Sequence, residues 1–137
     1  MNLESEIYKL SFELSEKIDV NDLQKLLGIL SNDGVYAMWI YAKDKFKKNK
    51  EQQKNDRSKE NKDQQKDKID IINYLVKELG NFVKGNKKDD ENIDNKYFQD
   101  LAQDLNKLLF MKELLEKVLI YAIYHAKAKG DKNGEKN

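Results

Sequence analysis

A cluster of lysines near the middle of the chain is the feature best suited to binding chemistry. Five of eight consecutive positions are lysines, namely Lys43, Lys45, Lys47, Lys48 and Lys50. On a helix these positions cover all faces, so some of them would point at any phosphate backbone lying alongside. Lysine suits phosphate contact without base readout because its charge sits on a flexible stem. The cluster is therefore a candidate phosphate-binding site, and a purely solvated surface is the alternative interpretation.

Residues that commonly perform catalysis are scarce. The chain has no cysteine and one histidine, His125, which excludes a thiol nucleophile and a multi-histidine metal site. We interpret His125 as a partner for a helix C-terminus, and the acidic run at 89–91 as a solvated loop. Sequence motifs for nucleotide binding or hydrolysis are absent. We therefore expect no enzyme activity, no cofactor, no metal and no small-molecule substrate.

Composition bounds the class of protein. With 137 residues the chain is long enough for one domain, which we place at 1–137. Lysine plus arginine (26) nearly balance aspartate plus glutamate (25), so nucleic-acid binding would have to come from local clustering. Glu4 and Glu6 make the start unlike a secretory signal, and no apolar run approaches the ~20 residues that span a bilayer. We expect a soluble, cytoplasmic protein without membrane contact.

Apolar residues recur every three or four positions, and proline is absent, which predicts an all-α fold. We expect a single bundle of about five helices, at 3–18, 21–30, 35–46, 69–83 and 96–129. Asn21 with Gln24 resembles a capping box for the second helix, and 31–34 is a run of turn residues. Trp39 and Leu105 lie on the most apolar stripes and are predicted to be core residues.

Residues 47–68 contain no aliphatic or aromatic side chain. Such a stretch cannot bury surface to offset its ordering entropy, so it is a solvated helix extension or a mobile loop. We expect a long, charged, mobile insert here and a flexible, frayed tail at 130–137. Just before this stretch, four aromatic residues could stack on bases, namely Tyr36, Trp39, Tyr41 and Phe46. Their spacing favours packing inside for most of them, and an edge residue such as Tyr41 could touch a ligand.

Three segments share a pattern with a known family: ILSNDGVYAMWIYAKDK at 29–45, IINYLVKELGNFV at 71–83 and YFQDLAQDLNKLLFMKELLEKVLIYAIYHAKAK at 97–129. In this order they resemble the small helical subunit of the type III-B CRISPR (Cmr) RNA-targeting effector complex. The resemblance implies a non-catalytic subunit for antiviral defence that stacks head to tail with copies of itself. It implies a filament lining the groove that holds guide RNA and target RNA, beside other effector subunits that carry the nuclease activity.

Within this interpretation the five lysines would be RNA-phosphate contacts. The acidic residues at 89–94 and the basic cluster could supply complementary patches for stacking. Two alternatives stay open: the small subunit of a type III-A or type I complex, and an unrelated helical adaptor whose lysines only keep it soluble and bind no RNA.

Overall fold

The computed structural model describes the backbone of residues 2–52, 58–85 and 92–134, and the side chains of 2–46, 68–85 and 92–130. Within these residues the structure is all-α, without strands, which confirms the predicted fold class. It has six helices: α1 (Leu3–Lys17), α2 (Val20–Asp33), α3 (Val35–Gln52), α4 (Ser58–Lys84), α5 (Asn95–Ala102) and α6 (Leu105–Gly134).

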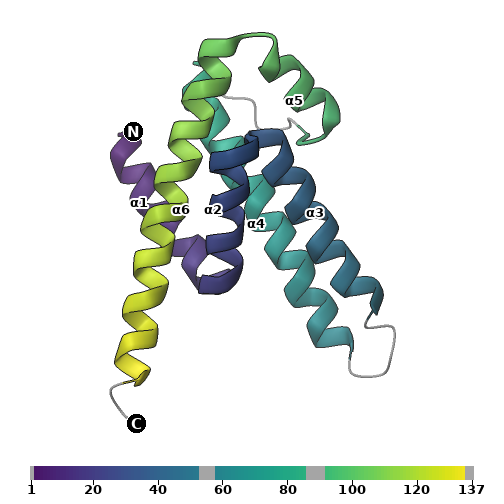
Figure 1. Ribbon diagram of the computed structural model, residues 1–137, viewed down its shortest axis with the longest axis vertical. Helices are drawn as coiled ribbons and strands as arrows, with labels where there is room; N and C mark the ends of the chain where they lie inside the picture. Colours follow the sequence, from purple (N-terminus) through teal and green to yellow (C-terminus); the bar gives the residue numbers. More distant parts are fainter. Residues whose placement is uncertain (1, 53–57, 86–91, 135–137) are drawn as a thin grey trace.

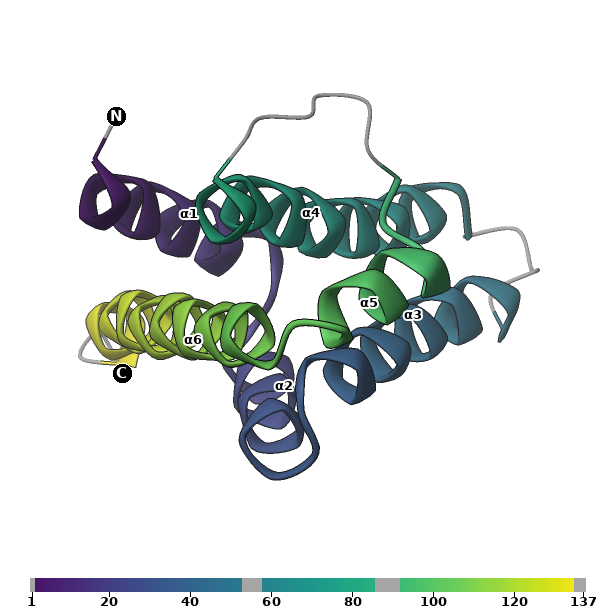
Figure 2. The same ribbon diagram turned by 90° about the horizontal axis from the view of Figure 1, so that it is seen from above.

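The helices form two groups that share one core. The long helix α6 packs against α1 and α2, while α3 and α4 lie side by side as an antiparallel pair (Figure 1). Helix α4 also contacts α1 and α6, which joins the pair to the rest of the bundle. The short helix α5 lies near the start of α3 and leads into α6 (Figure 2).

The core forms where the apolar stripes of the six helices meet. Its largest fully buried side chains include Trp39, Phe46, Leu10, Leu14, Leu23 and Leu30. Trp39 is 2% exposed, which confirms its predicted place in the core. One continuous cluster holds residues from all six helices, so burial of apolar surface stabilises the bundle as a unit.

Helix α2 begins earlier than the sequence pattern predicted. Asp19 has an extended backbone, and its side chain accepts a hydrogen bond of 2.9 Å from the Asp22 N–H. This is the geometry of an N-cap, so Asp19 satisfies a backbone donor that the helix itself leaves free. The capping box expected at Asn21 is therefore wrong, because Asn21 already lies within the first helical turn.

The predicted last helix, 96–129, is two helices in the structure. The backbone leaves the helical ladder at Gln103 and Asp104, and the Asp104 carboxylate accepts a hydrogen bond of 3.2 Å from the Lys107 N–H. That new N-cap starts α6 in a different direction from α5. Leu105 is the first residue of α6 and is 64% exposed, so the prediction that it belongs to the core is wrong.

The structure describes only parts of the expected insert and of the expected tail. The backbone is helical at 47–52 and again from Ser58 onward, so the structure does not confirm an insert over all of 47–68. Of the two alternatives, helix extension fits the residues on both sides of 53–57. Residues 53–57 themselves lie outside the described residues. Helix α6 continues to Gly134, because a glycine such as Gly130 lowers helix stability by only about 1 kcal/mol. Residues 135–137 lie outside the described residues, so the flexible tail expected at 130–137 stays a prediction.

In the described parts of the chain, no helix combines enough length with enough apolar character to cross a membrane.

Candidate nucleic-acid interface

The start of α3 is set by a glycine. Gly34 is the only residue between α2 and α3, and its φ of 102° lies in the region that side chains with a Cβ rarely adopt. Its N–H donates to the Leu30 carbonyl at 3.0 Å, while its own carbonyl accepts from the Met38 N–H at 3.1 Å. The turn predicted at 31–34 is thus concentrated in Gly34, and it aims α3 back across the bundle.

The first half of α3 is anchored by its apolar side. The buried residues of this half follow helical spacing: Val35, Met38, Trp39, Ala42 and Phe46. They face α2 and α4, which are the main neighbours of α3. The described lysines of the cluster therefore belong to a helix whose orientation is fixed by burial, and Phe46 is the last described anchor before the polar residues.

Trp39 fixes the position of α3 most strongly. Its indole N–H donates a hydrogen bond of 2.8 Å to Asn73 Oδ1 on α4. Its ring lies 4.9 Å from the Phe98 ring of α5 and 6.2 Å from the Tyr36 ring, measured between centroids. Aromatic pairs at such separations add to the stabilisation from burial. Three helices are therefore held together beneath the exposed face of α3.

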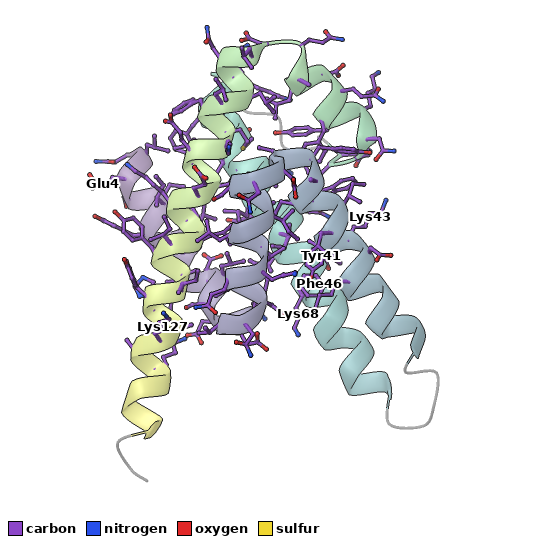
Figure 3. The ribbon with its side chains drawn as sticks, in the orientation of Figure 1. Glu4, Tyr41, Lys43, Phe46, Lys68 and Lys127 are labelled. Carbon is purple, nitrogen blue, oxygen red and sulfur yellow. The ribbon has the colours of Figure 1, made fainter. Side chains whose placement is uncertain are left out.

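Lys43 lies on the outer side of α3. It is exposed, and Figure 3 shows it pointing away from the bundle. Its ammonium nitrogen lies 5.0 Å from the centroid of the Trp39 ring, within the range of a cation–π contact. The ring holds the lysine stem near the surface of α3 and leaves the charge accessible to an anion.

Lys45 has a different environment. Its ammonium nitrogen lies 2.9 Å from Asp22 Oδ1, and the two side chains are 34% and 14% exposed. The hydrogen bond with Asp22 raises the pKa of Lys45, so the lysine stays charged and its charge is balanced by the carboxylate. Lys45 thus joins α3 to α2, which makes it less available for a phosphate than Lys43, the other described lysine of the cluster.

The other three lysines of the cluster, Lys47, Lys48 and Lys50, lie on the helical backbone of α3, and their side chains lie outside the described residues. Their register is still informative. Positions 43, 47 and 50 are spaced by four and three residues, so they share one side of the helix. Position 48 lies off this line.

The same side of α3 carries two further exposed residues: Tyr36, one of the four aromatic candidates, and Ile40, which the sequence pattern did not single out. Tyr36 is 45% exposed and Ile40 is 39% exposed, and they precede Lys43 by seven and three residues. Tyr41, the expected edge residue, is half-buried, and its hydroxyl contacts Lys45. A search of the sequence for seven-residue spacing back from Lys43 would have selected Tyr36. We call Tyr36, Ile40, Lys43, Lys47 and Lys50 the α3 strip.

The remaining candidates lie elsewhere. His125 is half-buried on α6, with its ring edge-on to Phe12 at 5.9 Å between centroids, so it packs against α1. The acidic residues at 89–91 lie outside the described residues. Among the described residues no group of three or more histidine, cysteine, aspartate or glutamate side chains is placed to hold a metal ion.

Comparison with known proteins adds no identification. No protein family, no curated protein and no solved structure matches the chain. The function must therefore be argued from the surface of the molecule, and above all from the α3 strip.

Proposed function

We propose that this chain is a non-catalytic small subunit of a type III-B CRISPR RNA-guided effector complex, and that the α3 strip lies along the RNA backbone. The observation that carries the proposal is the composition of one helix side, with Tyr36 and Ile40 followed by Lys43, Lys47 and Lys50. The resemblance of 29–45, 71–83 and 97–129 to the small Cmr subunit supports it.

The chemistry of the strip suits binding without sequence readout. Lysines at four-residue and three-residue steps can each neutralise a phosphate, and tyrosine offers a stacking face for any base. Arg57 is the one arginine in the chain, which leaves little capacity for bidentate base recognition. Among the five lysines of the cluster, we assign phosphate contact chiefly to Lys43, Lys47 and Lys50, and we assign Lys45 to the contact with Asp22.

The assembly follows from the same proposal. Copies of the chain stack head to tail into a short filament that lines the groove for guide RNA and target RNA in the cytoplasm. Other effector subunits form the rest of that groove and carry the nuclease activity. The anchored first half of α3 supports this role, because a rigid helix presents its charges at fixed spacing to a regular backbone.

The deciding experiment is the salt dependence of RNA binding. For single strands, the logarithm of affinity falls with the logarithm of salt concentration by about 0.7 per neutralised phosphate. A Lys43→Ala, Lys47→Ala double variant should flatten that slope by about 1.4 and weaken binding equally for unrelated RNA sequences. The matched control is Lys96→Ala, Lys107→Ala, which removes the same charge from exposed lysines of α5 and α6. Filter binding of RNA to the isolated chain, or to the assembled complex, measures the slope and the affinity for both double variants.

An unchanged slope in the strip variant would reject the α3 strip as the RNA contact. Equal losses in both double variants would indicate a general charge effect instead. Absence of any salt-sensitive retention by the wild-type chain and its complex would favour the helical adaptor. Copurification with a tagged copy of the chain distinguishes the type III-B complex from type III-A and type I complexes.

A further inference from the structure

Six exposed residues follow a seven-residue pattern on the outer side of α6. Successive members are three or four positions apart: Phe110, Glu113, Lys117, Ile120, Tyr124 and Lys127. This is the spacing of the a and d positions of a coiled coil. We call these residues the α6 seam. Figure 2 shows α1 and α2 on either side of α6, and none of the described helices covers the remaining side.

The α6 seam is separate from the buried side of the same helix. Residues such as Met111, Leu115 and Leu119 face the core and are fully buried. In contrast, the apolar members of the seam are 37% (Phe110), 38% (Ile120) and 64% (Tyr124) exposed. None of the six seam side chains forms a hydrogen bond, ion pair or ring contact with another described residue. Among the described residues these side chains therefore have no polar or aromatic partner, and part of their surface stays exposed.

We propose that the α6 seam binds the α6 seam of a second copy of this chain, with the two helices antiparallel. We place the two-fold axis between positions 118 and 119. Each residue at coiled-coil position a of one copy then lies opposite a residue at position d of the other copy. Phe110 then faces Lys127 of the second copy, Glu113 faces Tyr124, and Lys117 faces Ile120. Because the contact is two-fold, each pair occurs twice.

Every pair in this register is chemically complementary. The Lys127 ammonium can lie over the Phe110 ring as a cation–π contact. The Tyr124 hydroxyl can donate to the Glu113 carboxylate, and the methylene stem of Lys117 can cover Ile120 while its charge reaches water. A parallel arrangement would instead oppose Glu113 to Glu113 and Lys117 to Lys117. Charge thus favours the antiparallel over the parallel direction, and the seam is complementary to itself only when it pairs with a second copy in the antiparallel direction.

A hollow beside the seam provides space for the exposed tyrosine. It has a volume of about 410 Å³ and lies between α1 and α6, where its lining includes Glu113 and Lys117 of the seam. Leu3, Ile7 and Leu114 contribute apolar surface to it. In the proposed register Tyr124 of the second copy lies opposite Glu113, at the edge of this hollow. A ring seated there would lose the exposure that it has in the single chain.

The charges at the two ends of this surface also favour the antiparallel direction. Glu4 projects from the first turn of α1, on the upper half in Figure 3, and also lines the hollow. Lys127 lies on the lower half of α6 in the same view. A two-fold contact brings the basic end of each copy toward the acidic end of the other, which favours encounter in this orientation.

This contact is independent of the proposed function. It uses no residue of the α3 strip, and it is a closed two-fold contact, whereas the proposed filament stacks head to tail. RNA binding and dimer formation are therefore measured separately, and failure of one leaves the other standing.

Sedimentation equilibrium of the full chain tests the proposal. We expect a monomer–dimer equilibrium for the wild type. Ile120→Lys places a charge against Lys117 of the second copy at both symmetric positions and should weaken the dimer at least about tenfold. The matched control is Ile40→Lys, because Ile40 is exposed to the same degree as Ile120 (39% and 38%) but lies on α3. Adding Lys117→Glu to Ile120→Lys should restore association through two new ion pairs.

Cysteine cross-linking tests the register directly, because the chain contains no cysteine of its own. A mixture of Glu113→Cys and Tyr124→Cys chains should form a mixed disulfide dimer under mild oxidation. Neither variant alone should do so efficiently, since two copies of position 113 would lie about 16 Å apart along the helices. A monomeric wild type, a dimer unaffected by Ile120→Lys, or equal cross-linking of Glu113→Cys with a Lys25→Cys control would each overturn the proposal.

Discussion

The indole N–H of Trp39 donates a hydrogen bond of 2.8 Å to the side-chain oxygen of Asn73, which joins α3 to α4 across the core. Trp39 is 2% exposed, so its N–H has little access to water and depends on this acceptor. The bond fixes the rotation of α3 about its own axis. It thereby determines that Tyr36, Ile40 and Lys43 of the α3 strip are presented to solvent.

Loss of this acceptor should destabilise the fold. Asn73→Ala leaves the buried indole donor unsatisfied and should lower the free energy of unfolding by about 1–3 kcal/mol. Trp39→Ala should cost about 3–5 kcal/mol, because it also leaves a cavity. Urea unfolding followed by circular dichroism measures both. Asn106→Ala, on the exposed side of α6, is the control and should change stability by no more than about 0.5 kcal/mol. A similar small change for Asn73→Ala would contradict the prediction.

Two helical glycines should respond oppositely to the same substitution. A Cβ added at Gly80 would collide with the Tyr97 hydroxyl, whereas one added at Gly28 meets no atom within 4 Å. Gly80→Ala should therefore destabilise by about 1–3 kcal/mol through overpacking. Gly28→Ala should stabilise by about 0.5–1 kcal/mol, since alanine loses less conformational entropy in a helix.

Relief of the collision provides a further check on the Gly80 contact. Tyr97→Phe removes the hydroxyl, so Gly80→Ala should cost less in the Tyr97→Phe background than in the wild type. A double-mutant cycle of thermal unfolding measures the difference. Additive effects of the two substitutions would argue against a direct contact between these residues.

The break between α5 and α6 leads to a prediction about two leucines. Leu101 is 2% exposed at the end of α5, and Leu105 is 64% exposed at the start of α6. Leu101→Ala should cost about 2–5 kcal/mol, whereas Leu105→Ala should change stability by no more than about 0.5 kcal/mol. Equal losses in urea unfolding would indicate that α5 and α6 form one continuous helix with Leu105 in the core.

Stability should fall at alkaline pH. Burial, with the nearby Glu78 carboxylate, raises the pKa of Tyr74 above its ordinary value of 10.0, and the hydrogen bond with Asp22 raises that of Lys45 above 10.5. A raised pKa in the folded state means that the fold binds the proton more tightly than the unfolded chain. The contributions of Tyr74 and Lys45 to the free energy of unfolding are therefore complete below about pH 10. They are lost as the pH rises through the raised pKa values.

Substitution of the two groups tests this dependence. Tyr74→Phe and Lys45→Met together should make the loss of stability above pH 10 less steep, because neither replacement titrates. The free energy of unfolding, measured by urea titration on both sides of pH 10, gives the two slopes. Identical slopes for the wild type and the double variant would show that neither group contributes.

Several features of the fold could be predicted from the sequence. Apolar residues at three-residue and four-residue steps located α1, the first half of α3 and the second half of α4, because that spacing is a local property of one helix. The same spacing placed Trp39 in the core. Helix boundaries were less well predicted, since Asp19 and Asn21 are both good N-cap residues and the choice depends on where the preceding chain turns.

The candidate site was only partly predictable for the same reason. The sequence by itself showed a dense group of lysines at the end of an apolar helix. It could not show that Lys45 meets Asp22 of another helix, that the side of α3 with Tyr36 and Ile40 is exposed, or that Leu105 lies outside the core. Periodicity describes the faces of one helix relative to each other. Which face meets a neighbour, and which charge finds a partner, depends on how separate helices pack, and only the tertiary structure decides that.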